Sequence, residues 1–150
     1  NVKVFDNNIH KLRRLQSIVG HRIFTSVVQP KVLAKALKSA DVVIGALNSK
    51  IGRAPVVVTE EMVSQMKDFS VIVDVCIDKG GCIETSEVTS HDAPIFSKYG
   101  VIHYCVPNIA SRVARTASYA LSNVITPTIM DTGEFGGLEV MIKSYQGIQN

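Results

Sequence analysis

The feature that most constrains the fold is a repeated alternation between short β-branched runs and segments with helical spacing. Each apolar run is short enough for a single strand, and the runs are Val2–Phe5, Ile23–Val28, Val42–Ile44, Val71–Val75 and Val101–Val106. Continuous apolar strands separated by helices are typical of a parallel sheet that helices cover on both faces. The sequence therefore predicts an α/β fold.

Local signals place helices between these runs. The Asp-Asn-Asn cluster at positions 6–8 is a good N-cap ahead of apolar residues that recur at helical spacing. Pro30 can open the next helix at its first position. Thr59 can cap a short helix, and the two glutamates that follow it suit a helix N-terminus.

The C-terminal part predicts two more helices. A long helix is expected to begin at Asn108 or Ser111 and to be interrupted near Pro127. Leu138, Met141, Ile142 and Tyr145 have the spacing of a final amphipathic helix. We therefore expect one domain over residues 1–131, followed by a linker and terminal helix over residues 132–150.

Composition excludes several classes of function. The 150 residues carry a formal charge of only +3, and the basic run at 11–14 is interpreted as a solvated helix face rather than a nucleic-acid track. No stretch approaches the roughly 20 apolar residues that span a bilayer, and we expect no signal peptide. The three cysteines are odd in number and lack C-x-x-C spacing. We therefore expect buried free thiols, with no disulfide framework and no metal site.

Polar or small residues follow several of the predicted strands. These are Asp6, Gly45, Asp78 beside the glycines at 80–81, and Asn108. In open α/β sheets ligands bind beyond the carboxyl ends of the strands. Any one of these residues alone fits ordinary capping or turn chemistry, but their joint placement predicts a ligand site at one edge of the sheet.

Single residues leave alternatives open. Asp6 fits either a helix N-cap or the acid that binds ribose hydroxyls at the end of the second strand of a dinucleotide fold. Gly45 fits a simple turn or a close backbone approach. Asp78 is the candidate chemical group, whereas Asp74 is expected to be buried and structural. His103 could act in acid–base chemistry, although a lone strand histidine favours a satisfied core residue.

Longer stretches resemble a known family. The segments "VKVFDNN", "ADVVIGA", "MVSQMKDFSVIVDVCIDKGGCIETS" and "HYCVPNIASRVARTAS" together are similar to the cofactor-binding domain of the alanine dehydrogenase family. The resemblance runs from Val2 to about Met130, and the pair "IDKGGC" and "HYCVPN" makes it specific. The related transhydrogenase α subunit is the alternative, as is a dinucleotide-binding module without turnover.

This resemblance implies a Rossmann-like parallel sheet and NAD as the cofactor. It also implies oxidative deamination of L-alanine to pyruvate and ammonia, and the reverse reaction. Asp78 matches a catalytic aspartate. The positions that match cofactor contacts are Asp6, Lys11, Leu47, Asn48, Val75, Cys76, Ile77, Asp78, Val106, Pro107, Asn108 and Ile109. Lys79 and Glu87 depart from the family's usual Gln and Arg, and Asn48-Ser49-Lys50 replaces a more apolar turn.

The resemblance also sets expectations about what accompanies this chain. The family's substrate-binding residues lie in a separate N-terminal region, so L-alanine or pyruvate would bind through a domain that is missing here. We expect a cytoplasmic homo-oligomer without nucleic-acid or membrane partners. Because a dinucleotide fold has strand order 3-2-1-4-5-6, this chain should lack the first strand and the glycine-rich loop. We therefore expect a gap between Val2–Phe5 and Val42–Gly45, or a strand supplied from elsewhere. We also expect weak NAD binding and no activity from this chain alone.

Overall fold

The computed structural model describes residues 1–48 and 52–130. Its strands are β1 (Lys3–Phe5), β2 (Phe24–Ser26), β3 (Val42–Gly45), β4 (Val71–Asp74), β5 (Ile95–Lys98) and β6 (Val101–Tyr104). Its helices are α1 (Ile9–Val19), α2 (Pro30–Leu37), α3 (Glu60–Ser64), the 3-10 turns η1 (Ile77–Lys79) and η2 (Ile109–Val113), and α4 (Ala114–Met130). The expected terminal helix over 132–150 lies outside the described residues.

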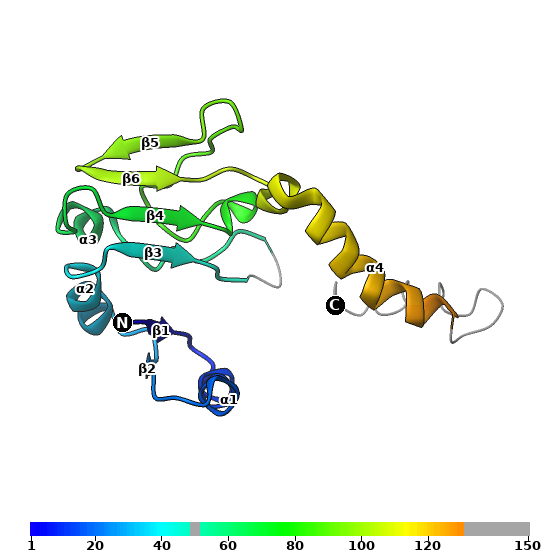
Figure 1. Ribbon diagram of the computed structural model, residues 1–150. Coiled ribbons are helices and arrows are strands. Elements are labelled where there is room, and N and C mark those ends of the chain that lie inside the picture. Colours follow the sequence, from blue (N-terminus) through cyan, green and yellow to red (C-terminus); the bar gives the residue numbers. More distant parts are fainter. Residues whose placement is uncertain (49–51, 131–150) are drawn as a thin grey trace.

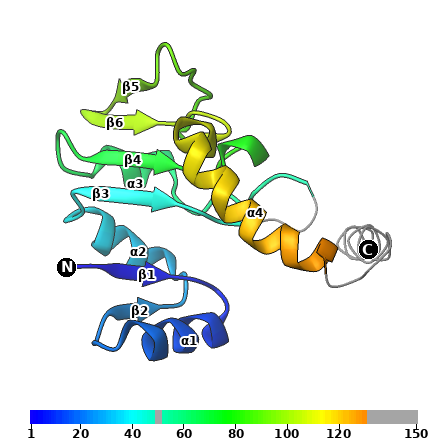
Figure 2. The same cartoon turned by 45° about the vertical axis from the view of Figure 1, so that its right-hand side comes forward.

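The strands form two separate sheets (Figure 1). β1 pairs in parallel with β2, while β3, β4, β6 and β5 form a four-stranded sheet in that order. β3, β4 and β6 are parallel, and β5 is antiparallel to β6. β1 and β3 run in the same direction in Figure 2, but they are not hydrogen-bonded to each other. The predicted gap between these two strands is confirmed.

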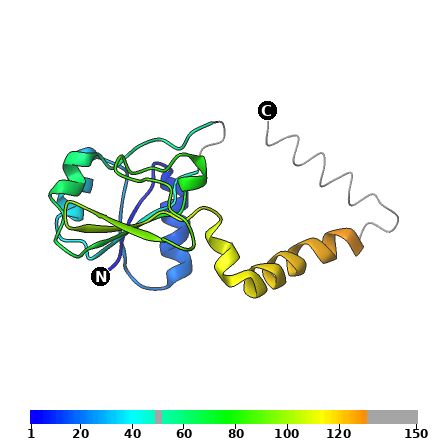
Figure 3. The ribbon, with the colours of Figure 1, turned by 90° about the horizontal axis from the view of Figure 1, so that it is seen from above.

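Helices lie on both sides of the strands. Viewed from above, α1 is on one side and α2 and α3 are on the other (Figure 3). The Asn8 side chain caps α1 by accepting hydrogen bonds from the backbone N–H groups of His10 and Lys11. Pro30 is the first residue of α2, and Thr59 caps α3. The predicted α/β architecture and its capping signals are therefore confirmed.

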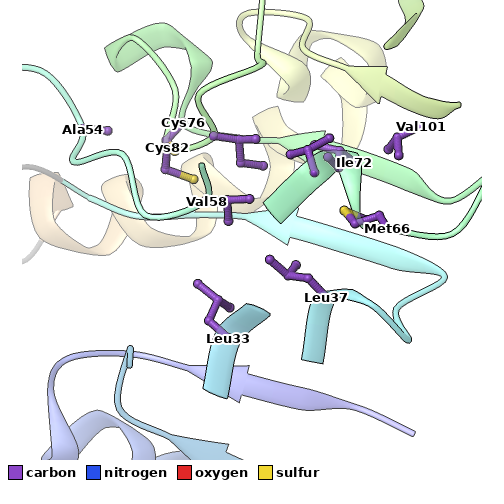
Figure 4. Close-up of a cluster of buried hydrophobic side chains, with 11 residues drawn as sticks. Leu33, Leu37, Ala54, Val58, Met66, Ile72, Cys76, Cys82 and Val101 are labelled. Carbon is purple, nitrogen blue, oxygen red and sulfur yellow. The ribbon is translucent and has the colours of Figure 1, made fainter. Parts of the chain in front are cut away.

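The core lies between the four-stranded sheet and α2 and α3. Leu33 and Leu37 of α2 point toward the sheet, where Ile72 of β4 is completely buried (Figure 4). Val63 of α3 and Val101 of β6 are equally inaccessible. This packing fixes β4 at the centre of the sheet, and the site described below begins where β4 ends.

The last described helix projects away from the sheets (Figure 1). It begins as the 3-10 turn η2 and continues as α4 to Met130, so the predicted interruption near Pro127 is wrong. Proline removes one backbone N–H donor and thus one hydrogen bond of the helix. An exposed helix can lose that bond because no tertiary contact opposes the local adjustment. The apolar side chains of Val113, Leu121 and Val124 are exposed. No helix within the described ranges is long and apolar enough to cross a membrane.

Candidate functional site at the strand ends

The loops that follow three parallel strands lie together at the carboxyl ends of the strands in the larger sheet. β3 ends at Gly45, β4 at Asp74 and β6 at Tyr104. Because the carboxyl ends of parallel strands meet at the same edge, residues 46–48, 75–81 and 105–109 gather there (Figure 1). The predicted convergence of the polar residues after β3, β4 and β6 is thus observed.

Asp78 and Asn108 are in direct contact at this edge. The backbone N–H of Asn108 donates to both carboxylate oxygens of Asp78, at 3.2 and 3.3 Å. Asn108 adopts a left-handed backbone conformation with φ of 50°, a geometry that asparagine tolerates better than most residues. Both side chains are exposed. The contact places one carboxylate and one carboxamide at the carboxyl ends of the strands, where both side chains remain accessible to a ligand.

Lys79 links the same turn to the loop after β3. Its Nζ lies 2.8 Å from Oδ1 of Asn48. Arg53 donates to the carbonyl of Gly80 at 3.2 Å. The sequence marked Lys79 as a departure from the family pattern and as a possible neighbour of Asp78, and it did not identify Arg53. Their partners lie 31 and 27 residues away along the chain, so no local pattern could reveal either contact.

The side chain of Asp74 stabilises the turn that carries Asp78. Its carboxylate is buried and accepts hydrogen bonds from the backbone N–H groups of Cys76, at 3.2 Å, and Cys82, at 3.0 Å. The Ser86 hydroxyl donates to it at 2.7 Å. The expectation that Asp74 is buried and structural is confirmed, and Ser86 is a partner that sequence reasoning missed.

The position of the Asp74 carboxylate also explains the glycine at position 81. Gly81 has φ of 73°, and a Cβ there would lie 2.8 Å from Oδ2 of Asp74. Only glycine allows both the backbone conformation and this approach. Aspartate and glycine therefore shape the turn that carries Asp78.

The other predicted contact residues differ in exposure. Cys76, Ile77 and Val106 are buried. Leu47 is partly buried against the core. Val75 is exposed, and Pro107 and Ile109 are partly exposed.

Asp6 and Lys11 belong to the two-stranded sheet. The Asp6 carboxylate accepts from the backbone N–H of Asn8 at 2.7 Å, which is local turn chemistry. The N-cap of α1 is Asn8, so the N-cap alternative for Asp6 is wrong. The backbone N–H of Asp6 donates to the Ser26 carbonyl. Lys11 is exposed on α1. Within the described part of the chain, no hydrogen bond joins either side chain to Asp78 or Asn108.

His103 is a core residue. The Thr85 hydroxyl lies 2.8 Å from Nε2, and Nδ1 lies 3.0 Å from the Val101 carbonyl. The ring stacks on Phe96 with centroids 4.7 Å apart. Burial lowers the pKa of His103, which favours the neutral ring. The reading of His103 as a satisfied core residue is confirmed.

These features define an α/β domain of the Rossmann-like type, with a polar site at the carboxyl ends of the strands in a mostly parallel sheet. A family model described as "Alanine dehydrogenase/PNT, C-terminal domain" matches residues 1–150. The chain belongs to this family. The predicted family and Rossmann-like fold are thus confirmed.

Similar proteins support this assignment. The chain is 43% identical to an alanine dehydrogenase of Bacillus subtilis over 93% of this chain and 37% of that protein. It is 42% identical to an alanine dehydrogenase of Methanococcus maripaludis over 95% of this chain and 39% of that protein. The chain therefore spans less than two-fifths of the length of these relatives.

Two solved structures give the same picture. An L-alanine dehydrogenase superposes with a TM-score of 0.82 at 37% identity, covering 93% of this chain and 39% of that one. A transhydrogenase from Sinorhizobium meliloti superposes with a TM-score of 0.66 at 27% identity, covering 79% of this chain and 33% of that one. Both likenesses extend over most of the chain, and the alanine dehydrogenase is the more similar of the two.

Proposed function

We propose that this chain is the NAD(H)-binding part of an alanine dehydrogenase, which interconverts L-alanine with pyruvate and ammonia. The observation that carries the proposal is the contact between Asp78 and Asn108 at the carboxyl edge of the sheet. It occurs in a chain 43% identical to a protein named alanine dehydrogenase. NAD would supply the hydride acceptor and donor for this reaction.

The chemistry of the side chains fits such a cofactor. Asp78 and Asn108 offer an exposed carboxylate and carboxamide, which suit the amide of a nicotinamide ring. Backbone groups of Val75, Cys76, Ile77, Val106, Pro107 and Ile109 would line the same end. Leu47 and Asn48, after β3, would serve the adenosine side, together with Asp6 and Lys11. A carboxylate at Asp6 would favour NAD over NADP because it repels a 2′-phosphate.

Asp78 would act on the substrate side of the cofactor. Its exposed carboxylate can orient the ammonium or imine group of a bound amino acid, since the Asn108 N–H fixes its position. The substrate's own carboxylate and the acid–base group would be held by the part of the relatives that this chain does not cover. The protein that acts would be a cytoplasmic homo-oligomer, and the exposed apolar side of α4 supports further packing there.

The complete protein tests this proposal through turnover. We expect Asp78→Asn to lower the rate of pyruvate formation tenfold or more, corresponding to about 1.4 kcal/mol or more of barrier. Asp41→Asn is the matched control, because Asp41 is an exposed aspartate just before β3, at the opposite edge of the sheet. Equal rates in both variants would remove Asp78 from the chemistry.

Cofactor choice is tested by titrating NADH and NADPH into the same protein. Asp6→Ser should reduce the preference for NADH, whereas Asp41→Asn should leave it unchanged. Preference for NADPH in the unaltered protein would contradict the role given to Asp6.

A transhydrogenase-type domain is the second candidate, favoured by the likeness to the Sinorhizobium meliloti structure. A dinucleotide-binding module without turnover is the third. L-alanine-dependent reduction of NAD separates alanine dehydrogenase from both. Hydride exchange between two nicotinamide nucleotides without L-alanine would favour the transhydrogenase, and binding without either reaction would favour the module.

A further inference from the structure

Three potential metal ligands meet beneath the turn that carries Asp78. A carboxylate oxygen of Asp74 and the sulfur atoms of Cys76 and Cys82 all lie within 4.8 Å of one another. All three residues are buried. Figure 4 shows Cys76 and Cys82 next to each other at the end of the core. The sequence carries no metal motif here, because the fold rather than the spacing brings Cys82 back to Asp74.

The distances suit a small tetrahedral ion. Oδ1 of Asp74 lies 3.0 Å from Sγ of Cys76 and 3.8 Å from Sγ of Cys82. In a tetrahedral zinc site, metal–oxygen and metal–sulfur bonds of about 2.1 and 2.3 Å put oxygen and sulfur roughly 3.5 Å apart. The two observed distances lie on either side of that value. Only small side-chain movements would be needed to ligate an ion.

The surrounding hydrogen bonds orient the carboxylate for this role. Oδ2 of Asp74 accepts from the Ser86 hydroxyl and from the backbone N–H of Cys82, so it is already engaged. Oδ1 is the oxygen that faces both thiols, and it also accepts from the backbone N–H of Cys76 at 3.2 Å. Metal-ligating carboxylates are commonly fixed by such outer hydrogen bonds. A Cβ at position 45 would lie 2.5 Å from the sulfur of Cys82, so Gly45 leaves that sulfur its room.

We propose that Asp74, Cys76 and Cys82 form a binding site for a soft divalent cation such as Zn²⁺. Oδ1 and the two sulfurs are the protein ligands, and water takes the fourth position. On binding, the two thiols release their protons to solvent and become thiolates, with no change in oxidation state. A carboxylate with two thiolates selects Zn²⁺ over the hard cations Mg²⁺ and Ca²⁺. Because Cys76 and Cys82 flank Asp78 in sequence, the bound ion would stabilise the turn that carries Asp78.

Cobalt(II) is the probe, since it replaces zinc in such sites and absorbs visible light. The complete protein, reduced and free of dinucleotide, is titrated with Co²⁺. We expect one ion per chain, a tetrahedral visible spectrum and the charge-transfer band of sulfur bonded to cobalt. Excess Zn²⁺ should abolish both signals, and Mg²⁺ should not.

Variants assign the signal to these residues. Cys76→Ser and Cys82→Ser should each weaken Co²⁺ binding at least tenfold and reduce the charge-transfer band. Cys105→Ser is the matched control, because Cys105 is a buried free cysteine outside the cluster. Cys76 is the least buried of the three cysteines, so Cys76→Ser serves if Cys82→Ser fails to fold.

The outcomes separate clearly. An unaltered protein without the sulfur–cobalt band would overturn the proposal. So would a band that survives in Cys76→Ser, or one that disappears in Cys105→Ser. The titration uses neither NAD nor L-alanine, so its result is independent of the test of the proposed function.

Discussion

The two sheets are built from similar strand–helix–strand sequences but differ sharply in burial. In the two-stranded sheet, Phe24 is 46% exposed, and Leu12 is the one residue of α1 that is buried. In the four-stranded sheet, Ile72 of β4 and His103 of β6 are completely inaccessible. β4 has a neighbour on each side, whereas β1 has only β2. The buried core therefore forms around the strand that has a neighbour on each side and helices packed against it.

The difference extends to the residues proposed to bind the cofactor. Asp78 lies on a turn held by Asp74, by Arg53 and by the contact of Lys79 with Asn48. Asp6 is held by its local turn and by one backbone bond to Ser26. The nicotinamide end of the proposed site is therefore preorganised within this chain. The adenosine end depends on β1 keeping its position beside an unpaired strand edge.

The largest expected effect comes from removing a buried hydrogen-bond acceptor in the more deeply buried region, the four-stranded sheet. Asp74→Ala leaves the N–H groups of Cys76 and Cys82 and the Ser86 hydroxyl without their acceptor. Buried donors without partners cost about 1–3 kcal/mol each, so losing the acceptor of three donors should lower the free energy of unfolding by about 3 kcal/mol or more. Urea denaturation of the complete protein measures it.

The matched control is Asp41→Ala. Asp41 is an exposed aspartate whose ion pair with Lys67 spans 2.7 Å at the surface. Exposed pairs contribute little because water and salt screen them. Similar urea midpoints for the two variants would show that the hydrogen bonds of Asp74 do not hold the turn.

A pair of core truncations compares the two sheets directly. Ile72→Ala removes a fully buried side chain from β4, the strand between β3 and β6, and we expect a loss of about 3–5 kcal/mol in the free energy of unfolding. Leu12→Ala removes the one buried side chain of α1, where the surroundings can relax, so the expected loss is about 2–3 kcal/mol. Amide hydrogen exchange should also be slower in β4 than in β1. A greater loss for Leu12→Ala would reverse the comparison.

Much of the fold could be predicted because its signals are local. Apolar runs marked β1, β2, β3, β4 and β6, and side-chain caps marked the starts of α1 and α3. β5 was missed because Ile95–Lys98 is a short edge strand with only two apolar residues, and it pairs only with β6. Its turn has positive φ at Tyr99 and Gly100, and tyrosine gives little warning of that conformation.

The site was predictable in outline only. Parallel strand ends must meet, so the approach of Asp78 to the loop after β6 followed from the topology. The acceptor role of Asp78 toward the Asn108 backbone depends on residues 30 positions apart, and so does not appear in the sequence. The residues of the cluster Asp74, Cys76 and Cys82 lie close in the sequence, but their approach depends on the turn with positive φ at Gly80 and Gly81, which the spacing does not reveal.

The smallest expected effect is a pH dependence that arises in the four-stranded sheet. Nδ1 of His103 faces the Val101 carbonyl, which can only accept, so Nδ1 carries the proton and Nε2 accepts from Thr85. Burial lowers the pKa of this neutral ring, while the unfolded chain would bind a proton near the usual value of about 6.5. The unfolded state therefore binds more protons as the pH falls below 7. The stability contributed by the neutral ring is complete above that range and declines toward pH 5, by at most about 1.4 kcal/mol per pH unit.

Urea midpoints measured across this range in His103→Gln should show a shallower decline than in the unaltered protein. His10→Gln, at an exposed position on α1, should keep the full decline. If His10→Gln flattened the profile and His103→Gln did not, the exposed two-stranded region would control the pH response.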